Sequence, residues 1–171
     1  MRETGHLRWS GGLAFSGASG SEGTIAWEGA DGLPGLRPSE AVLASLGACT
    51  AMDVIAILVK KRQVVERYEV RLEAELADLH PKVFRMIEIL HEVDGPEVAV
   101  EAVRRSIELS ATRYCIVSAT LSSGTVEIHH RYLVRNAEGE HRAEVVVTGP
   151  LGRGVRYDDG AAPTRPPSQT G

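Results

Sequence analysis

The chain has 171 residues, a formal net charge of −4 at pH 7 and 43% hydrophobic residues. This length suits one domain with a buried core and a tail, and the mixed charges argue against a nucleic-acid surface. Two cysteines are too few for a secreted disulfide scaffold, the N-terminus has no apolar signal-peptide segment, and no apolar run spans a bilayer. We therefore expect a soluble cytoplasmic protein with no nucleic-acid or membrane partner.

The N-terminal part is rich in glycine and serine and predicts short strands at residues 6–9, 12–16 and 24–28. The glycines and serines of residues 17–23 predict the turn before the last of these strands. A Gly/Pro linker at 31–36 leads into the next element.

Residues 37–62 predict a long central helix. Pro38 suits its first turn, Glu40 complements the positive end of its dipole, and three basic residues end it. Apolar residues lie on nearly every face, so this helix should be buried within protein. Polar residues interrupt it too often for a membrane span, and it carries Cys49, one of two cysteines.

Residues 67–76 alternate charged and apolar side chains and predict the clearest strand. His80-Pro81 marks a turn, and 83–93 returns as a second strand of an antiparallel hairpin. A second helix is expected from residue 97 to about 112, followed by the Cys115 segment 111–121. The pattern leaves open whether that segment continues the helix.

Residues 125–134 alternate again and predict a strand. We expect one domain at 1–134 and an extension at 135–171, in which 144–148 is compatible with one more strand before a disordered tail. The element order indicates an α+β fold with antiparallel sheets, because the hairpin connections are too short for parallel crossovers.

Cys49 and Cys115 are the main candidates for chemistry. Each is either a small buried hydrophobe or one half of a reactive pair, and reactivity requires a lowered thiol pKa. No Cys-x-x-Cys motif is present, so we expect neither a zinc site nor a thioredoxin motif. Asp53 follows Cys49 by one helical turn and is expected to be a hydrogen-bonded polar residue.

The histidines are expected to be structural or at the surface. His129 and His130 are neighbours on a strand and should point to opposite faces, so they do not form one metal site. No motif for a nucleotide or a serine hydrolase is present, and we expect no cofactor and no metal.

Three features of the chain resemble the OsmC/Ohr superfamily, in its YhfA-like branch. They are the segment PSEAVLASLGACTAMDV on the central helix, the hairpin, and the segment RYCIVSATL that follows the hairpin. The resemblance covers residues 5–134. It implies an OsmC-like α+β fold, with antiparallel sheets wrapped around two long central helices in an intertwined homodimer.

The resemblance also implies a thiol-dependent peroxidase that reduces organic hydroperoxides. Cys49 would attack the peroxide and become a sulfenic acid. Cys115 would resolve it as an intramolecular disulfide, which an external dithiol reduces. The substrate pocket would then lie at the dimer interface.

The family's activating residues are only partly matched. An arginine of the N-terminal region normally stabilises the thiolate, and a glutamate after the helix-starting proline holds that arginine. Here Ser39 follows Pro38, and the carboxylate comes one residue later, at Glu40. Arg37 is the first candidate for the cation, with two further arginines as alternatives: Arg8 and Arg113. Ile116 replaces a proline that much of the family places after the second cysteine.

Two alternatives remain open at this point. The chain could be a relative without peroxidase activity that binds a small apolar or thiol-reactive ligand at the dimer interface. It could also be a structural protein whose cysteines belong to the core.

Overall fold

The computed structural model describes residues 3–19, 23–30, 34–150 and 155–156. The chain divides into two compact units, Met1–Ser45 and Leu46–Gly171.

The first unit contains a three-stranded antiparallel sheet of β1 (Gly5–Gly11), β2 (Ala14–Ser19) and β3 (Thr24–Trp27), in this order. Three strands were predicted here, but the second was misplaced. β1 turns into β2 at Gly11 and Gly12, whose φ angles of 119° and 53° favour glycine. β2 therefore continues to Ser19, where a turn was expected; residues 20–22 of that turn lie outside the described residues.

Helix α1 (Pro38–Lys60) matches the predicted central helix within two residues at each end. The Arg37 backbone N–H donates to Glu40 Oε2 at 2.9 Å, as in the capping box of a helix start. By length and composition α1 could cross a membrane, but core helices of soluble proteins meet the same criterion. Only 28% of its most apolar window is buried by the chain itself, so burial of this helix within protein stays a prediction for the part that the single chain leaves uncovered.

The second unit contains a five-stranded sheet in the order β4-β5-β6-β7-β8. The strands are β4 (Arg67–Leu76), β5 (Phe84–Asp94), β6 (Glu127–Asn136), β7 (Gly139–Thr148) and β8 (Val155–Arg156). The predicted antiparallel hairpin is β4 and β5, which confirms that interpretation.

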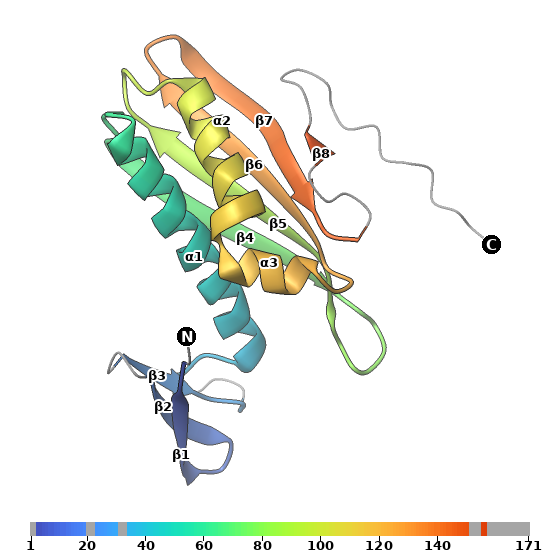
Figure 1. Cartoon of the computed structure of the whole chain (residues 1–171). Helices are drawn as coiled ribbons and strands as arrows, with labels where there is room; N and C mark the ends of the chain where they lie inside the picture. The colour runs from blue at the N-terminus through green and yellow to red at the C-terminus, as the bar shows by residue number, and fades with distance from the viewer. Residues whose placement is uncertain (1–2, 20–22, 31–33, 151–154, 157–171) are drawn as a thin grey trace, which may run out of the picture. The chain divides into compact units, whose positions relative to one another are not determined.

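The expectation of purely antiparallel pairing is wrong, because β5 and β6 are parallel. Residues 95–126 between them are long enough for a crossover that returns the chain to the same end of the sheet. The crossover consists of α2 (Val100–Leu109), a π-helical turn η1 (Ser110–Tyr114) and α3 (Ile116–Ser122). Figure 1 shows these elements on one face of the sheet.

The hydrophobic core lies between this sheet and the helices on it. Val54 and Leu58 of α1 pack with Val103 and Ile107 of α2 and with residues of β5, β6 and β7. Burial of these side chains fixes the helices on the sheet.

The boundary expected at residue 134 falls inside β6. β7 pairs with β6 along its length, so the strand expected at 144–148 is the second half of a longer strand in the same sheet. The tail expected at 160–171 lies outside the described residues.

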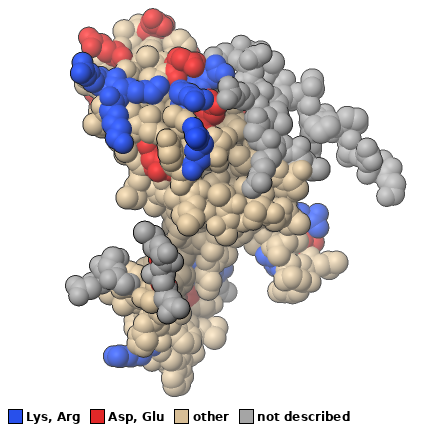
Figure 2. All heavy atoms as spheres, in the orientation of Figure 1, with Lys and Arg blue, Asp and Glu red and all other residues tan. Residues whose placement is uncertain are grey.

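The two sheet faces differ in chemistry, as the alternating pattern predicts. His130 is fully buried, whereas its neighbour His129 lies on the other face between Glu144, at 2.6 Å from Nδ1, and Glu127, at 2.5 Å from Nε2. The expectation that the two histidines face opposite sides is confirmed. Figure 2 shows acidic and basic side chains interspersed where α2 begins and few charges around α3.

Candidate functional site

Helix α1 positions two of the site's side chains. Cys49 and Asp53 are one turn apart and project from the same helix face. Two residues earlier, Gly47 lies against β4: a Cβ there would approach Leu72 Cδ1 to 2.7 Å. The missing side chain thus allows α1 to pack closely on the sheet beside the cysteine.

Cys115 sits in the break between η1 and α3. Its backbone is extended, with φ −69° and ψ 103°, and its N–H donates to Ser110 O at 2.9 Å. Its Sγ accepts from the Ser118 N–H at 3.3 Å and so caps α3. The question left open by the sequence is settled: residues 111–114 continue α2 as η1, whereas residues 116–121 belong to the separate helix α3, which Cys115 caps.

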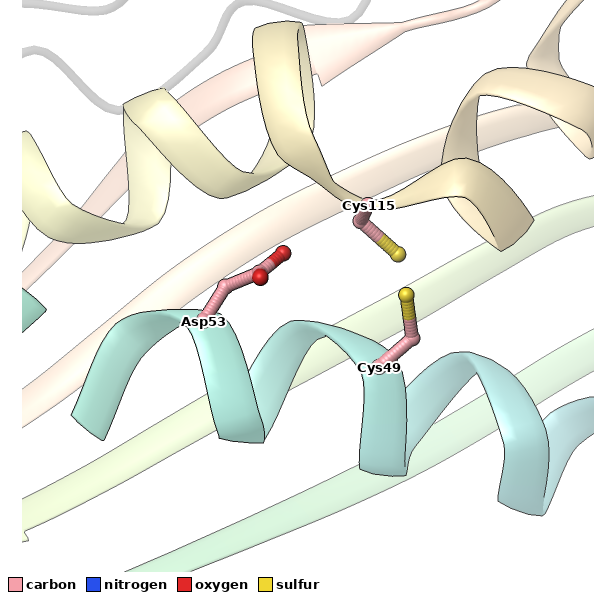
Figure 3. A group of neighbouring side chains, drawn as sticks. All are labelled: Cys49, Asp53 and Cys115. Carbon is pink, nitrogen blue, oxygen red and sulfur yellow. The ribbon is translucent and has the colours of Figure 1, made fainter. Parts of the chain in front are cut away.

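The fold brings Cys49, Asp53 and Cys115 together. The two sulfur atoms and one Asp53 carboxylate oxygen all lie within 4.8 Å of one another. Figure 3 shows the two sulfurs pointing toward each other and the carboxylate reaching into the same space from α1. Both cysteines are free thiols; Cys49 is partly exposed, whereas Cys115 is only 2% exposed.

Two buried hydroxyl groups orient the carboxylate. Ser110 Oγ donates to Asp53 Oδ2 at 2.9 Å, and Thr50 Oγ1 lies 3.1 Å from Ser110 Oγ. Ser110 and Thr50 are fully buried, and their hydroxyls hydrogen-bond within the protein. Asp53 is therefore a hydrogen-bonded polar residue, as expected. Ser110 and Thr50 were not recognised from the sequence, although Thr50 directly follows Cys49.

The two thiols differ in environment. Burial, followed by the hydrogen bond and charge of Cys49, raises the pKa of the Cys115 thiol to about 12. The backbone N–H of Ser118 acts in the opposite direction and does not offset this effect. Cys115 is therefore a protonated thiol at neutral pH.

A row of polar rings lies in the core of the same unit. Tyr68 Oη is 2.8 Å from His91 Nδ1, and the His91 ring stacks on that of His130 with centroids 5.9 Å apart. Burial, and then the negative charge of Asp53, raises the pKa of Tyr68 well above its usual value of 10. This row was not recognised from the sequence, which gives only the face of each strand residue.

The expected activating residues lie in the other unit. Arg8, Arg37 and Glu40 belong to Met1–Ser45, whereas the cysteines belong to Leu46–Gly171. Glu40 accepts the Arg37 N–H, which agrees with its interpretation as a stabiliser of the helix start. Arg113 is exposed and precedes Cys115 by two residues. The roles of these residues at the thiol stay predictions.

A family model described as "OsmC-like protein" matches residues 29–131, which include both cysteines and the elements between them. The chain belongs to the OsmC-like family. Protein YhfA of Escherichia coli K12 is 38% identical over 128 residues, which cover 75% of this chain and 95% of YhfA. The resemblance to the YhfA-like branch is thereby confirmed.

Solved OsmC-like structures share this α+β fold. A hypothetical protein from Aquifex aeolicus has a TM-score of 0.68 and 30% identity, covering 78% of this chain and 96% of its own. An organic hydroperoxide resistance protein, OsmC, from Legionella pneumophila has a TM-score of 0.58, with coverage of 78% and 96%. Its identity is 12%, so it shows a likeness of fold alone.

Proposed function

We propose that this OsmC-like chain is a thiol-dependent peroxidase that reduces organic hydroperoxides through Cys49 and Cys115. The observation that carries this function is the pair of free sulfur atoms facing each other across the gap between α1 and the start of α3 (Figure 3). The two sulfurs lie within 4.8 Å of each other, and disulfide formation would bring them to about 2.05 Å.

The roles of the two cysteines follow from their exposure. Cys49 is partly exposed and can be reached by a peroxide, whereas Cys115 is buried and protonated. Cys49 is thus the attacking thiol and Cys115 the resolving thiol.

The reaction has three balanced steps. The Cys49 thiolate attacks one peroxide oxygen, the O–O bond breaks, and the alcohol leaves after taking a proton. The Cys115 sulfur then attacks the Cys49 sulfenic acid; the S–S bond forms and water leaves with the Cys115 proton. An external dithiol reduces the disulfide and is itself oxidised.

Exposed apolar residues flank the two cysteines on their own elements. Ile116 directly follows Cys115 and is 70% exposed, and Met52 on α1 is also 70% exposed. Such side chains would contact the alkyl group while the peroxide oxygens approach Cys49. The Legionella protein of similar fold is an organic hydroperoxide resistance protein, which agrees with this substrate class.

The protein would act as a homodimer in the cytoplasm. Ala48, Met52, Ala56 and Val59 form an exposed apolar stripe on α1, spaced by three or four residues. An uncovered apolar helix face of this kind is buried when a second copy of the chain packs on it. The substrate pocket would then lie at the interface, beside the thiols.

The test is an intact-mass titration of the reduced protein with one equivalent of an organic hydroperoxide. We expect a rapid loss of two hydrogens and the appearance of one equivalent of alcohol. Cys49→Ser should abolish peroxide consumption. Cys115→Ser should stop at a sulfenic acid, which adds one oxygen and can be trapped by a 1,3-dione.

If both thiols stay reduced while the protein remains folded, the peroxidase proposal is wrong. Binding of an apolar ligand that survives Cys49→Ser would instead favour the ligand-binding alternative.

A further inference from the structure

The cysteine site contains one donor that peroxide reduction does not use. Asp53 contributes a carboxylate oxygen within 4.8 Å of both sulfurs. None of the three steps of the proposed peroxide reduction involves this carboxylate.

The donor atoms match the preferences of zinc. Zn²⁺ binds thiolate sulfur at about 2.3 Å and carboxylate oxygen at about 2.0–2.2 Å. In a tetrahedral site two sulfur ligands are therefore roughly 3.8 Å apart, and a sulfur and an oxygen roughly 3.6 Å. The three donors lie within 4.8 Å of one another, so small rotations of three side chains would bring them to these separations. Two thiolates also exclude magnesium and calcium, which prefer oxygen ligands.

The Asp53 carboxylate is oriented by hydrogen bonds, as the ligands of metal sites are. Fully buried Ser110 donates to Asp53 Oδ2 at 2.9 Å and itself lies 3.1 Å from the hydroxyl of Thr50. Hydrogen bonds from such neighbours orient the first ligands of metal sites. The bond from Ser110 engages Oδ2, and Figure 3 shows the carboxylate in the same space as the two sulfurs.

Access and charge are also suitable. Cys49 and Asp53 are partly exposed, so a cation can enter from solvent, while Cys115 closes the inner side. Binding displaces the thiol protons, and the dication then faces two thiolates and one carboxylate, which leaves a net charge of −1 at the site. Three protein ligands leave the fourth zinc position to water.

We propose that Cys49, Asp53 and Cys115 of the reduced chain form a Zn²⁺ site, and that bound zinc switches off peroxide reduction. The switch rests on the proposed function, because it acts by removing the free Cys49 thiolate. Zinc binding and the Cys49–Cys115 disulfide exclude each other, since each uses both sulfurs. Zinc would thus hold the thiols in reduced form until it is withdrawn.

The test measures zinc binding to the reduced, metal-free full chain under anaerobic conditions, in competition with a chromophoric chelator. We expect one zinc per chain and no binding by the disulfide form. Cys49→Ser and Cys115→Ser should each abolish the site, and Asp53→Asn should weaken binding by a factor of about 10–100. The matched control is Asp78→Asn, on an exposed loop, which should bind like the wild type.

Cobalt gives a second readout that does not depend on activity. Co²⁺ in the same site should show a sulfur-to-cobalt charge-transfer band and the strong visible bands of tetrahedral cobalt. The proposed zinc site is wrong if Asp53→Asn binds zinc with the same affinity as the wild type. It is also wrong if Cys49→Ser still binds one zinc.

A parallel assay of hydroperoxide consumption separates the two proposals. Zinc should suppress consumption and a chelator should restore it. If the metal-free chain consumes hydroperoxide but binds no zinc, the zinc site is wrong and the peroxidase stands. If zinc binds through these three residues but the metal-free chain leaves the hydroperoxide intact, the peroxidase and the switch are wrong and the site stands.

Discussion

Replacement of His130 by glutamine should reduce the loss of stability that the protein suffers on mild acidification. His130 is fully buried on β6, its ring stacks on buried His91, and burial lowers its pKa from 6.5 to about 4. The folded chain thus keeps this ring neutral, whereas the unfolded chain lets it protonate below pH 6.5.

The sign and size of the pH effect on the free energy of unfolding follow from this difference in pKa. Below pH 6.5 the unfolded state binds one more proton at this residue, so the free energy of unfolding falls as the pH falls. At pH 5 the loss is about 2 kcal/mol, because each pH unit between the unfolded pKa of 6.5 and the solution pH contributes about 1.4 kcal/mol. The loss is complete near pH 4, at the folded pKa.

Other groups change stability in the same range or just below it. Burial also lowers the pKa of His91, which adds to the loss. The hydrogen bond that the His129 ring donates to the Glu144 carboxylate raises the pKa of His129, so protonation of His129 stabilises the folded protein on acidification and opposes the loss. Burial and Arg135 act on Asp94 in opposite directions, with its pKa lowered overall, so its contribution is lost only at lower pH, below its usual pKa.

The measurement is urea unfolding at pH 7 and pH 5, at one fixed protein concentration, for the wild type and for His130→Gln. The variant should lose about 2 kcal/mol less than the wild type between the two pH values. The control is His80→Gln, at an exposed loop position that is hydrated in both states, and it should follow the wild type. If His130→Gln loses as much stability as the wild type, burial of a neutral histidine is not the cause of the acid sensitivity.

Two further changes test the packing of α1. Gly47→Ala places a Cβ 2.7 Å from Leu72 Cδ1, so the leucine side chain must move to make room. This cost should cancel the roughly 1 kcal/mol that alanine otherwise gains over glycine inside a helix, so the free energy of unfolding in urea should not rise, and Gly124→Ala, with its nearest atom at 3.6 Å, should have little effect. A rise of about 1 kcal/mol in Gly47→Ala would contradict the close approach of α1 to the sheet. Met52→Glu, in the exposed stripe, should convert the proposed dimer to a monomer in sedimentation velocity, while Leu79→Glu, at a position that is 82% exposed outside the stripe, should remain dimeric. A Met52→Glu dimer of unchanged stability would show that this face is not the interface.

The local elements were predictable because their signals are local. Pro38 and Glu40 mark the start of α1, and the alternation from residue 67 to 76 defines β4. Both signals depend on residues within a few positions of one another. The misplaced second strand has a local cause too: two adjacent glycines, Gly11 and Gly12, make the turn after β1, so β2 begins at Ala14, two residues later than expected.

Pairing between distant segments could not be predicted in the same way. β5 and β6 are parallel neighbours because the helices between them pack on the sheet and return the chain to the end at which β5 begins. The same pairing places His91 and His130 on adjacent strands with stacked rings, although the sequence predicted only that the histidines are structural or at the surface.

The sequence by itself determined the α+β class, the family resemblance and the two cysteines that carry the proposed chemistry. Only the tertiary structure decided that Cys49, Cys115 and Asp53 share one small space, and that Ser110 holds the carboxylate there. The physical reason is that helix and strand periodicities act within one element. The meeting of two sulfurs from separate elements depends instead on the break at Cys115, the close packing at Gly47 and the burial of the helices on the sheet.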